Sequence, residues 1–506
     1  MKISVVVDMA ADGFADRVLV GRRSTGLTAA RLRAVSRAGA RRIRAAGADA
    51  LLYLGVNGPA FPVALFAAAQ AGVPLVPVNY RLGGEQLRSL LARHPQALGL
   101  GGPVEAALLR EAGITALTFE EWLETPAEAD EDIDEHADPE AVAAIIYTSG
   151  TTSAPKGVLV RHRNLLAYVF GTVEFASAGE DEAALISVPP YHIAAVANAI
   201  TNLYSGRRTI VLEQFTPSDW LDHVRIEGVT HALVVPTMLA RIVGAASGPG
   251  GDLPSLRSLA YGGAPMPASV IEAALRRWPH VGFVNAYGLT ETSSTIAVLG
   301  PADHRAALAS EDPAIRARLS SAGRAVPGVE LAVRGEDGKD LPPGETGRIW
   351  VRGGQVAAEY TGSGSATDAG GWFDTRDQGR LDEDGYLFIG GRADDTIIRG
   401  AENIAPAEIE DVLLGHPDVE DAIVVGVPDE EWGQRIEGAV VLRAGATPDS
   451  ETLRAHVRSR LRGSKTPDRI ALWTSIPRTE TGKLVRRDAL RLLLEATGSE
   501  GGRRDG

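Results

Sequence analysis

Residues 147–158 read YTSGTTSAPKGV and directly follow the apolar run AVAAII at residues 141–146. Small hydroxyl side chains and Gly150 let backbone N–H groups approach a phosphate closely, and Lys156 adds a positive charge. The alternative is an ordinary turn rich in Ser, Thr and Gly. A phosphate-binding loop explains this stretch better, because so many of its positions suit phosphate binding. The segment therefore predicts a phosphate-binding loop after a buried strand.

The loop differs from the GxxxxGK[ST] loop of P-loop enzymes, in which Lys and then Ser or Thr directly follow the second Gly. Here Lys156 precedes Gly157. A kinase or a transport ATPase of the P-loop class is therefore excluded.

The bulk composition narrows the class of protein. A chain of 506 residues is too long for one hydrophobic core, so we expect two or more domains. Its 44% hydrophobic and 23% charged residues are ordinary for a globular protein. The net charge of −14 argues against nucleic acid as a partner. The absence of Cys excludes disulfides and thiolate chemistry and fits a reducing cytosol, so we expect a cytoplasmic protein.

The longest apolar stretch, residues 60–78, has two interpretations. A membrane span needs ~20 residues of unbroken helix, whereas this stretch is interrupted by Pro62, Gly72, Pro74 and Pro77. We therefore expect a buried helix, a turn and a buried strand, and no membrane span. The apolar run at the N-terminus ends at Asp8 and is too short for a signal peptide.

Helical patterns alternate with short strands along the first part of the chain, which is typical of βαβ units with parallel strands. Residues 120–140 are read as a solvated acidic connector. Between residues 323 and 389, Gly-punctuated stretches such as EDGKDLPPGETGRIWVRG (residues 336–353) predict a small antiparallel β subdomain. The expected helices are 27–46 and 62–71, and the expected strands are 50–54, 74–77, 143–147, 184–188, 209–212 and 232–235.

The predicted fold class is α/β. We expect a large N-terminal domain, residues 1–391, with two doubly wound sheets plus the small β subdomain, and a smaller α+β C-terminal domain at residues 392–506. The tail after Ala496 is expected to be disordered.

The loop at residues 147–158 resembles the signature of the acyl-adenylate-forming (AMP-binding) superfamily. This superfamily includes acyl- and aryl-CoA synthetases, the adenylation domains of peptide synthetases and firefly luciferase. Ser153 stands where the family usually has Gly. The ATP-binding residues that the resemblance implies here are Thr148, Ser149, Gly150, Thr151, Thr152 and Lys156.

Further motifs of this family follow in order. NAYGLTET at residues 285–292 is similar to its adenylate-binding segment. This implies that Tyr287 stacks on adenine, Thr290 contacts the α-phosphate and Glu291 holds Mg²⁺, as suits an aromatic face, a hydroxyl and a hard carboxylate. Asn285, Ala286 and Gly288 belong to the same nucleotide site.

Two turns complete the implied pockets. GGAP at residues 262–265 resembles the turn that lines the acid pocket and the nucleotide pocket of this family. The resemblance implies that Gly262 and Gly263 line the acid pocket and that Gly263 and Ala264 line the nucleotide pocket. GWFDTRD at residues 371–377 resembles the family's G-W-x-x-T-G-D, which assigns the ribose hydroxyls to Asp377. Arg376 replaces the usual Gly, so the geometry of that turn is in question.

The last two motifs imply that residues 1–391 form the adenylation domain and that residues 392–506 form a mobile C-terminal domain. GRADDTIIRGAEN at residues 391–403 resembles the hinge, with Arg392 on the ribose or phosphate and Asp394 as the pivot. PRTETGKL at residues 477–484 places Lys483 where the family keeps its catalytic lysine. Lys483, Glu291 and Lys156 would carry catalysis by offsetting negative charge, and no general base is needed because a carboxylate is already ionised.

The resemblance thus implies an acid–thiol ligase that uses ATP and Mg²⁺ to form an acyl-adenylate and then a coenzyme A (CoA) thioester. His192, within SVPPYHIAAVANAI (residues 187–200), is expected at the mouth of the acid pocket, and a pure packing role is its alternative. Aromatic and medium-length acids both fit. A catalytically inactive nucleotide sensor is a rival, but Lys483, Glu291 and Asp377 are all present.

The acceptor of the acyl group is less determined. Gly400 and Ala401 match the family's route for a pantetheine arm, and Trp432 matches an aromatic that packs on the CoA adenine in some relatives. Basic residues between 454 and 487 suit CoA phosphates or form a solvated face. Ser464 and Thr466 stand where some CoA ligases place an aromatic residue and an Arg. Transfer to a carrier protein's pantetheine or to an amine therefore stays open, and so does the oligomeric state.

Overall fold

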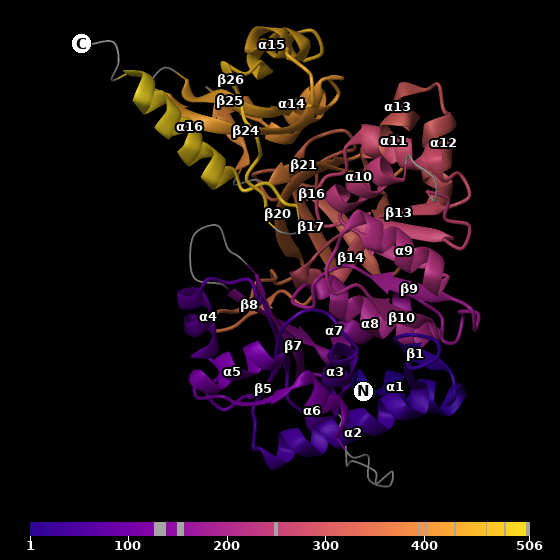
Figure 1. Cartoon of the computed structure of the whole chain (residues 1–506). Helices are drawn as coiled ribbons and strands as arrows, with labels where there is room; N and C mark the ends of the chain where they lie inside the picture. Colours follow the sequence, from indigo (N-terminus) through magenta and orange to yellow (C-terminus); the bar gives the residue numbers. More distant parts are fainter. Residues whose placement is uncertain are drawn as a thin grey trace.

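The computed structural model describes residues 1–125, 138–148, 156–246, 251–392, 395–399, 402–429, 432–461, 463–479 and 482–501. Two α/β units form one end of the molecule, a β subdomain follows, and the C-terminal domain lies at the other end (Figure 1). The α/β fold class with a large N-terminal and a smaller C-terminal domain is confirmed.

The first sheet has the order β19-β18-β8-β7-β4-β3-β5-β6 in the described residues. Its central pairs are parallel, as expected, whereas β8 pairs antiparallel with β7 and with β18. The strands are β3 Leu51–Leu54, β4 Leu75–Val78, β5 Leu98–Gly101, β6 Thr115–Thr118, β7 Val142–Thr148, β8 Lys156–Arg161, β18 Glu359–Tyr360 and β19 Gly364–Ser365. The helices of this unit are α2 Ala29–Ala45, α3 Ala60–Ala71, α4 Gly84–Leu91, α5 Pro103–Glu111 and α6 Phe119–Leu123.

The second sheet has the order β15-β14-β13-β12-β11-β9-β10-β1-β2 in the described residues. Strands β9 to β13 are parallel, and the strand pairs at both edges are antiparallel. Short connections turn the chain back between β1 and β2 and between β13 and β14, whereas α12 and α13 lie between β14 and β15. The strands are β1 Val18–Val20, β2 Leu27–Thr28, β9 Ala183–Ile186, β10 Arg208–Val211, β11 His231–Val234, β12 Ser258–Gly262, β13 Gly282–Leu289, β14 Ser294–Leu299 and β15 Arg324–Ala325. The helices are α1 Ser4–Gly13, α7 His162–Thr172, α8 Ile193–Ser205, α9 Pro217–Glu227, α10 Pro236–Ala245, α11 Ala268–Arg277, α12 Pro301–Ala309 and α13 Pro313–Ala317.

Each sheet buries both of its faces. In β3, Leu51 and Tyr53 belong to the core that contains α3, whereas Leu52 and Leu54 pack with α4 and α5. This alternation follows from the two-residue period of a strand, and it explains why the strand reads as a continuous apolar run. The doubly wound arrangement predicted from the sequence is confirmed.

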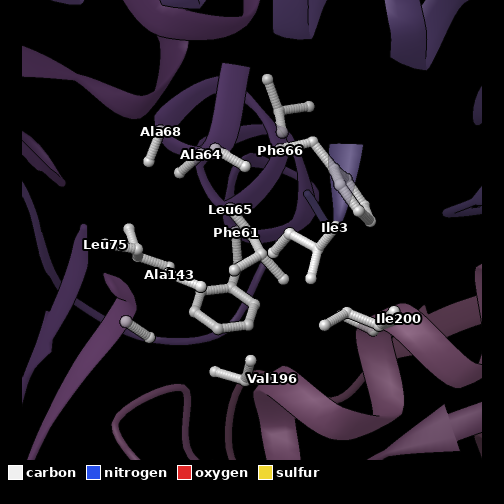
Figure 2. Close-up of a cluster of buried hydrophobic side chains, with 14 of the residues drawn as sticks. Ile3, Phe61, Ala64, Leu65, Phe66, Ala68, Leu75, Ala143, Val196 and Ile200 are labelled. Carbon is white, nitrogen blue, oxygen red and sulfur yellow. The ribbon is translucent and has the colours of Figure 1, made fainter. Parts of the chain in front are cut away.

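A shared core joins the two α/β units and positions the start of α8. Phe61 of α3 faces Val196 and Ile200 of α8 in Figure 2. The apolar stretch at residues 60–78 is thus α3, a turn at Gly72 with φ of +84° and β4, as expected. No helix in the described part of the chain is long and apolar enough to cross a membrane.

Element boundaries differ from the sequence-based expectations near two helix starts. The expected helix 27–46 begins at Ala29, because the Thr28 hydroxyl accepts a hydrogen bond from the Arg31 N–H and caps it. The acidic connector was predicted without structure, but its start forms α6. A reciprocal capping box between Thr118 and Glu121 begins that helix.

The β subdomain is a four-stranded antiparallel sheet in the order β16-β17-β20-β21, as expected. Its strands are β16 Val329–Arg334, β17 Gly347–Gly353, β20 Phe373–Leu381 and β21 Leu387–Arg392. One part of this region behaves differently from the prediction, because β18 and β19 leave the subdomain and extend the first sheet. An ion pair of 2.7 Å between Arg161 and Glu359 fixes β18 against β8.

The C-terminal domain has mixed α+β structure, as predicted, and its boundary at residues 391 and 392 stays a prediction. Its elements are β22 Ile397–Arg399, β23 Glu402–Ile404, α14 Pro406–Leu414, β24 Val419–Asp429, β25 Gly433–Leu442, α15 Ser450–Arg458, β26 Arg469–Leu472 and α16 Arg486–Gly501. The expectation of disorder directly after Ala496 is wrong, because α16 continues to Gly501. Ala489 and Leu493 anchor this helix against the sheet, and extending an anchored helix is cheaper than nucleating one.

His162 gives the fold a testable dependence on pH. It is 1% exposed and its Nδ1 accepts a hydrogen bond from the Ile3 N–H at 3.4 Å. Burial, with the nearby Lys2, lowers its pKa from 6.5 to about 4. Between pH 6.5 and pH 4, His162 is therefore protonated in the unfolded chain but neutral in the folded chain. The free energy of unfolding falls as the pH drops through this range.

Denaturant unfolding at pH 7.5 and at pH 5 tests this expectation. His162 should account for about 2 kcal/mol of the stability lost between these pH values. His162→Gln should flatten the pH dependence by that amount, whereas His280→Gln, at an exposed position, should leave it unchanged. Equal slopes for all three proteins would contradict the assignment.

Candidate active site

The loop that carries Lys483 contacts the N-terminal domain. Gly482 has φ of +79°, and a Cβ added there would lie 2.8 Å from Oγ1 of Thr237 on α10. The loop is internally braced, since the Thr479 hydroxyl accepts a hydrogen bond from the Lys483 N–H at 3.0 Å. The absence of a side chain at Gly482 thus permits the close approach of the two domains.

Lys483 lies near residues of four other motifs. Its side chain keeps solvent access, but many protein atoms surround it. This desolvation lowers the pKa of Lys483, Arg392 acts in the same direction, and Asp377 and Glu291 oppose it. The structure therefore brings the predicted lysine to the predicted nucleotide residues.

Asp377 is held from both sides of its carboxylate. The Tyr287 hydroxyl donates a 2.6 Å hydrogen bond to Oδ2, and Arg392 Nε lies 3.0 Å from Oδ1. Burial raises the pKa of Asp377, whereas Arg392 and the Tyr287 hydroxyl lower it. The side chain is 7% exposed and is fixed before any nucleotide arrives. Ribose binding by Asp377 and adenine stacking by Tyr287 stay predictions.

The turn before Asp377 keeps its shape although Arg376 replaces Gly. Arg376 adopts φ of +61°, a left-handed conformation that costs a residue with a side chain roughly 1–2 kcal/mol. Asp374 accepts a hydrogen bond from the Arg376 N–H at 2.8 Å, and the Thr375 hydroxyl accepts one from the Asp377 N–H at 3.1 Å. Local hydrogen bonds thus support a strained residue next to the carboxylate.

The GGAP turn and the NAYGLTET segment lie side by side on neighbouring strands. Gly262 at the end of β12 pairs with Ala286 of β13, and any side chain at Gly262 would collide with the Ala286 carbonyl oxygen. Gly263 follows with φ of +83°, and Ala264 continues the turn. Both motifs therefore present the carboxyl ends of parallel strands, where α/β proteins bind ligands. Asn285, Tyr287 and Gly288 continue along β13.

Thr290 and Glu291 lie in a short 3-10 helix, η1 (Thr290–Thr292), between β13 and β14. The Glu291 carboxylate accepts a hydrogen bond from the Tyr360 hydroxyl at 2.9 Å on Oε1. No group of three or more potential metal ligands gathers anywhere in the described residues. A single carboxylate that works together with ATP phosphates and water is the arrangement that Mg²⁺ accepts in nucleotide enzymes. The donor set around Glu291 therefore fits the implied ion.

The phosphate-loop motif joins two antiparallel strands. Thr148 ends β7 and Lys156 begins β8, and the two residues are paired across the ladder. The Lys156 side chain is exposed, and its Nζ lies 5.9 Å from the centre of the Tyr360 ring. Ser149, Gly150, Thr151 and Thr152 lie outside the described residues.

His192 directly precedes α8 and is held in the neutral form. Burial, and next the charge of Lys483, lower its pKa to about 4. Its Nε2 is buried and has no hydrogen-bond partner. An unsatisfied ring nitrogen close to Lys483 favours the pocket interpretation over pure packing, because buried polar atoms normally find a partner. The neighbouring Asn198 amide is already used, since it donates to the Ala194 carbonyl at 2.8 Å.

The structure describes only some of the residues predicted to form the hinge and the acceptor site. Asp394, Gly400 and Ala401 lie outside the described residues. Trp432 is 46% exposed, and the guanidinium of Arg399 lies 5.5 Å from its ring centre. An exposed aromatic ring beside a cation suits a nucleobase with phosphates, and this role stays a prediction.

The basic segment at residues 454–487 is less cationic than its sequence suggests. Lys465 pairs with Glu408 at 2.6 Å, and Arg478 pairs with Asp421 at 2.6 Å. Arg486 pairs with Glu410. These carboxylates come from other elements of the domain, so the sequence pattern alone did not reveal the neutralisation.

Two residues of this site were not identified from the sequence. Tyr360 donates a hydrogen bond to Glu291, and Thr237 contacts Gly482 in the loop that carries Lys483. Neither belongs to a stretch with a recognisable pattern, and both reach the site through tertiary contacts.

Comparison with known proteins identifies the family. The chain matches the AMP-binding enzyme family over residues 7–361 and the AMP-binding enzyme C-terminal domain over residues 408–483. The first match covers most of the chain. The protein therefore belongs to the AMP-binding enzyme family, whose members form adenylates, and the resemblance noted in the sequence is confirmed.

Individual relatives differ in the acceptor or product that their names give. A feruloyl-CoA synthase from Amycolatopsis sp is 36% identical over 480 residues, which cover 92% of this chain and 94% of that protein. The fatty acid–[acyl-carrier-protein] ligase ScoC from Streptomyces coeruleorubidus is 34% identical over 88% of each chain. The solved structure of the amide bond synthetase McbA from Marinactinospora thermotolerans has a TM-score of 0.86 and 30% identity, covering 97% of this chain and 99% of that chain.

Proposed function

We propose that this protein uses ATP to activate a carboxylic acid as an acyl-adenylate, releases pyrophosphate and then transfers the acyl group to CoA. The observation that carries the proposal is that the Lys483 charge lies close to Glu291, to the Asp377–Arg392 ion pair and to His192. These residues come from both domains and from segments far apart in the sequence. A packing role alone does not require this concentration of charges.

In the first step an acid oxygen forms a bond to the α-phosphorus of ATP, and the bond from that phosphorus to pyrophosphate breaks. The obstacle is repulsion between two anions. Lys483 would lie between the acid carboxylate and the α-phosphate, and Lys156 would offset charge on the departing phosphates. Mg²⁺ held at Glu291 would supply further positive charge to offset the charge of the departing phosphates. Neutral His192 would border the acid without adding charge.

Asp377, Tyr287 and Arg392 would orient the nucleoside. Because the Asp377 carboxylate is fixed by two partners, the ribose would meet a preformed acceptor. Gly262 and Gly263 would line the acid pocket, and Ala264 would face the nucleotide. The strand ends that hold these turns are rigid, which suits a site that must align the acid with phosphorus.

For the second step we propose that residues 392–506 rotate about Asp394, remove Lys483 from the cleft and open a route past Gly400 and Ala401. The contact between Gly482 and Thr237 supports this proposal, because neither residue belongs to a buried apolar cluster of its domain. The CoA relatives favour CoA as the acceptor. ScoC and the amide bond synthetase keep a carrier protein and an amine as the alternatives.

Acid-dependent ATP–pyrophosphate exchange tests the proposed function directly. A panel of aromatic and aliphatic acids should reveal at least one that supports exchange without CoA. Adding CoA, a phosphopantetheinyl carrier protein or a primary amine to separate reactions, with mass analysis of the products, then identifies the acceptor. Exchange with no acyl-CoA product would move the assignment to one of the alternatives. Nucleotide binding without exchange for any acid would favour an inactive sensor.

Trp432→Ala should raise the KM for CoA while leaving pyrophosphate exchange nearly unchanged. The loss of a stacking surface should cost ~1–3 kcal/mol, or about 5- to 150-fold in KM. Phe170→Ala is the matched control, because Phe170 is 45% exposed but lies on α7. Unchanged KM values for CoA in both variants would place the adenine of CoA elsewhere.

A further inference from the structure

Tyr360 contacts both charged groups that would handle the phosphate end of ATP. Its hydroxyl donates to Glu291 Oε1 at 2.9 Å, and its ring face lies 5.9 Å from Lys156 Nζ. Glu291 belongs to η1 of the second sheet's unit, whereas Lys156 begins β8 of the first sheet. The Tyr360 side chain therefore links the two α/β units, because it contacts Glu291 of one unit and Lys156 of the other.

The backbone around Tyr360 is fixed to the same two units. Tyr360 pairs with Val158 across the ladder between β18 and β8, and the Thr361 N–H donates to the Gly157 carbonyl at 2.8 Å. On the other side, the Ala357 N–H donates to the Glu291 carbonyl at 2.7 Å. Tyr360 thus has little freedom to move relative to either group.

The Tyr360 hydroxyl is the donor in its contact with Glu291, because a carboxylate only accepts hydrogen bonds. A hydroxyl bonded to Oε1 fixes the plane of the carboxylate and leaves Oε2 to face a cation. Outer hydrogen bonds of this kind orient ligating carboxylates and set metal affinity.

We infer that Tyr360 is a positioning residue that orients Glu291 for Mg²⁺ and aligns Lys156 with the departing pyrophosphate. The inference rests on the proposed adenylation function. In this inference a single side chain outside the recognised motifs positions both the metal-binding carboxylate and Lys156. The Tyr360 hydroxyl orients Glu291, and the Tyr360 ring contacts Lys156, so different substitutions can remove the two contributions separately.

Tyr360→Phe removes the hydroxyl and keeps the ring. The Mg²⁺ concentration for half-maximal pyrophosphate exchange should rise ~10-fold, and the KM for the acid should stay unchanged. Binding of Mn²⁺ to the enzyme with a non-hydrolysable ATP analogue, followed by electron paramagnetic resonance, should weaken by the same factor. This second readout needs no turnover, so it remains decisive even if no acid in the panel supports exchange.

Tyr360→Leu removes the ring as well. Relative to the Phe variant, it should raise the KM for pyrophosphate in the reverse reaction by a further ~2–5-fold, the size of an exposed cation–aromatic contact. The Mg²⁺ midpoints of the two variants should be similar. Thermal unfolding of each variant checks that the fold is intact.

Two other tyrosines donate to carboxylates and serve as comparisons. The Tyr386 hydroxyl donates to Asp303 Oδ1 at 2.7 Å, outside the site, so Tyr386→Phe should leave the Mg²⁺ midpoint unchanged. Tyr287→Phe should weaken ATP binding through Asp377 without moving that midpoint. A Tyr360→Phe enzyme with a normal Mg²⁺ midpoint and normal Mn²⁺ binding would overturn the inference. A reduced kcat alone, with both metal readouts normal, would show a purely structural role and would overturn it equally.

Discussion

Replacement of Lys483 by Ala is expected to lower acid-dependent adenylation by ~100-fold or more, the scale of removing a preorganised charge from a transition state. The reason is the position of the side chain. Lys483 lies near Asp377, Glu291 and Arg392 and is surrounded by protein atoms, so its positive charge interacts more strongly than it would in water. Pyrophosphate exchange with a saturating acid is the measurement.

The same variant should still convert a supplied acyl-adenylate to the thioester, because the proposed rotation removes Lys483 from the cleft before the thiol attacks. Lys339→Ala serves as a control, since Lys339 lies in an exposed turn of the β subdomain. Equal losses in both half-reactions would contradict the two-conformation model.

Gly482→Ala should impair adenylation by ~10- to 100-fold through docking rather than chemistry. The new Cβ would lie 2.8 Å from Thr237 Oγ1 and 2.9 Å from its Cγ2, which is closer than packed atoms approach. In addition, φ of +79° disfavours any residue with a side chain by roughly 1–2 kcal/mol. Lys483 would remain present but would reach the cleft less often.

Thr237→Ala removes both of the atoms that the new methyl group meets. The double variant should therefore recover part of the lost exchange activity, and the remaining deficit should reflect the backbone strain at Gly482. Thioester formation from a supplied acyl-adenylate should be normal in all three variants. A double variant that is no better than Gly482→Ala would show that the loop docks in a different way.

Local sequence patterns predicted the alternation of helices and strands and six of the parallel strands. These six appeared as apolar runs of four or five residues, because a strand buried on both faces has no polar positions to interrupt it. The departures have local causes. The Thr118–Glu121 capping box produced α6 inside an acidic connector, and anchoring by Leu493 extended α16 beyond the predicted end.

The amino-acid sequence alone establishes which residues form motifs and in what order these motifs follow one another. Such features are encoded locally, in spacing and in residue type, so they do not depend on knowing the neighbours in space.

Which charged groups lie close together depends on the tertiary structure. The contact between Gly482 and Thr237 holds Lys483 near Asp377, and the pairing of β18 with the first sheet brings Tyr360 to Glu291. Electrostatic and hydrogen-bond energies depend on distances between groups that lie far apart along the chain. No local pattern records those distances, so the pairing of residues within the site became visible only in the folded molecule.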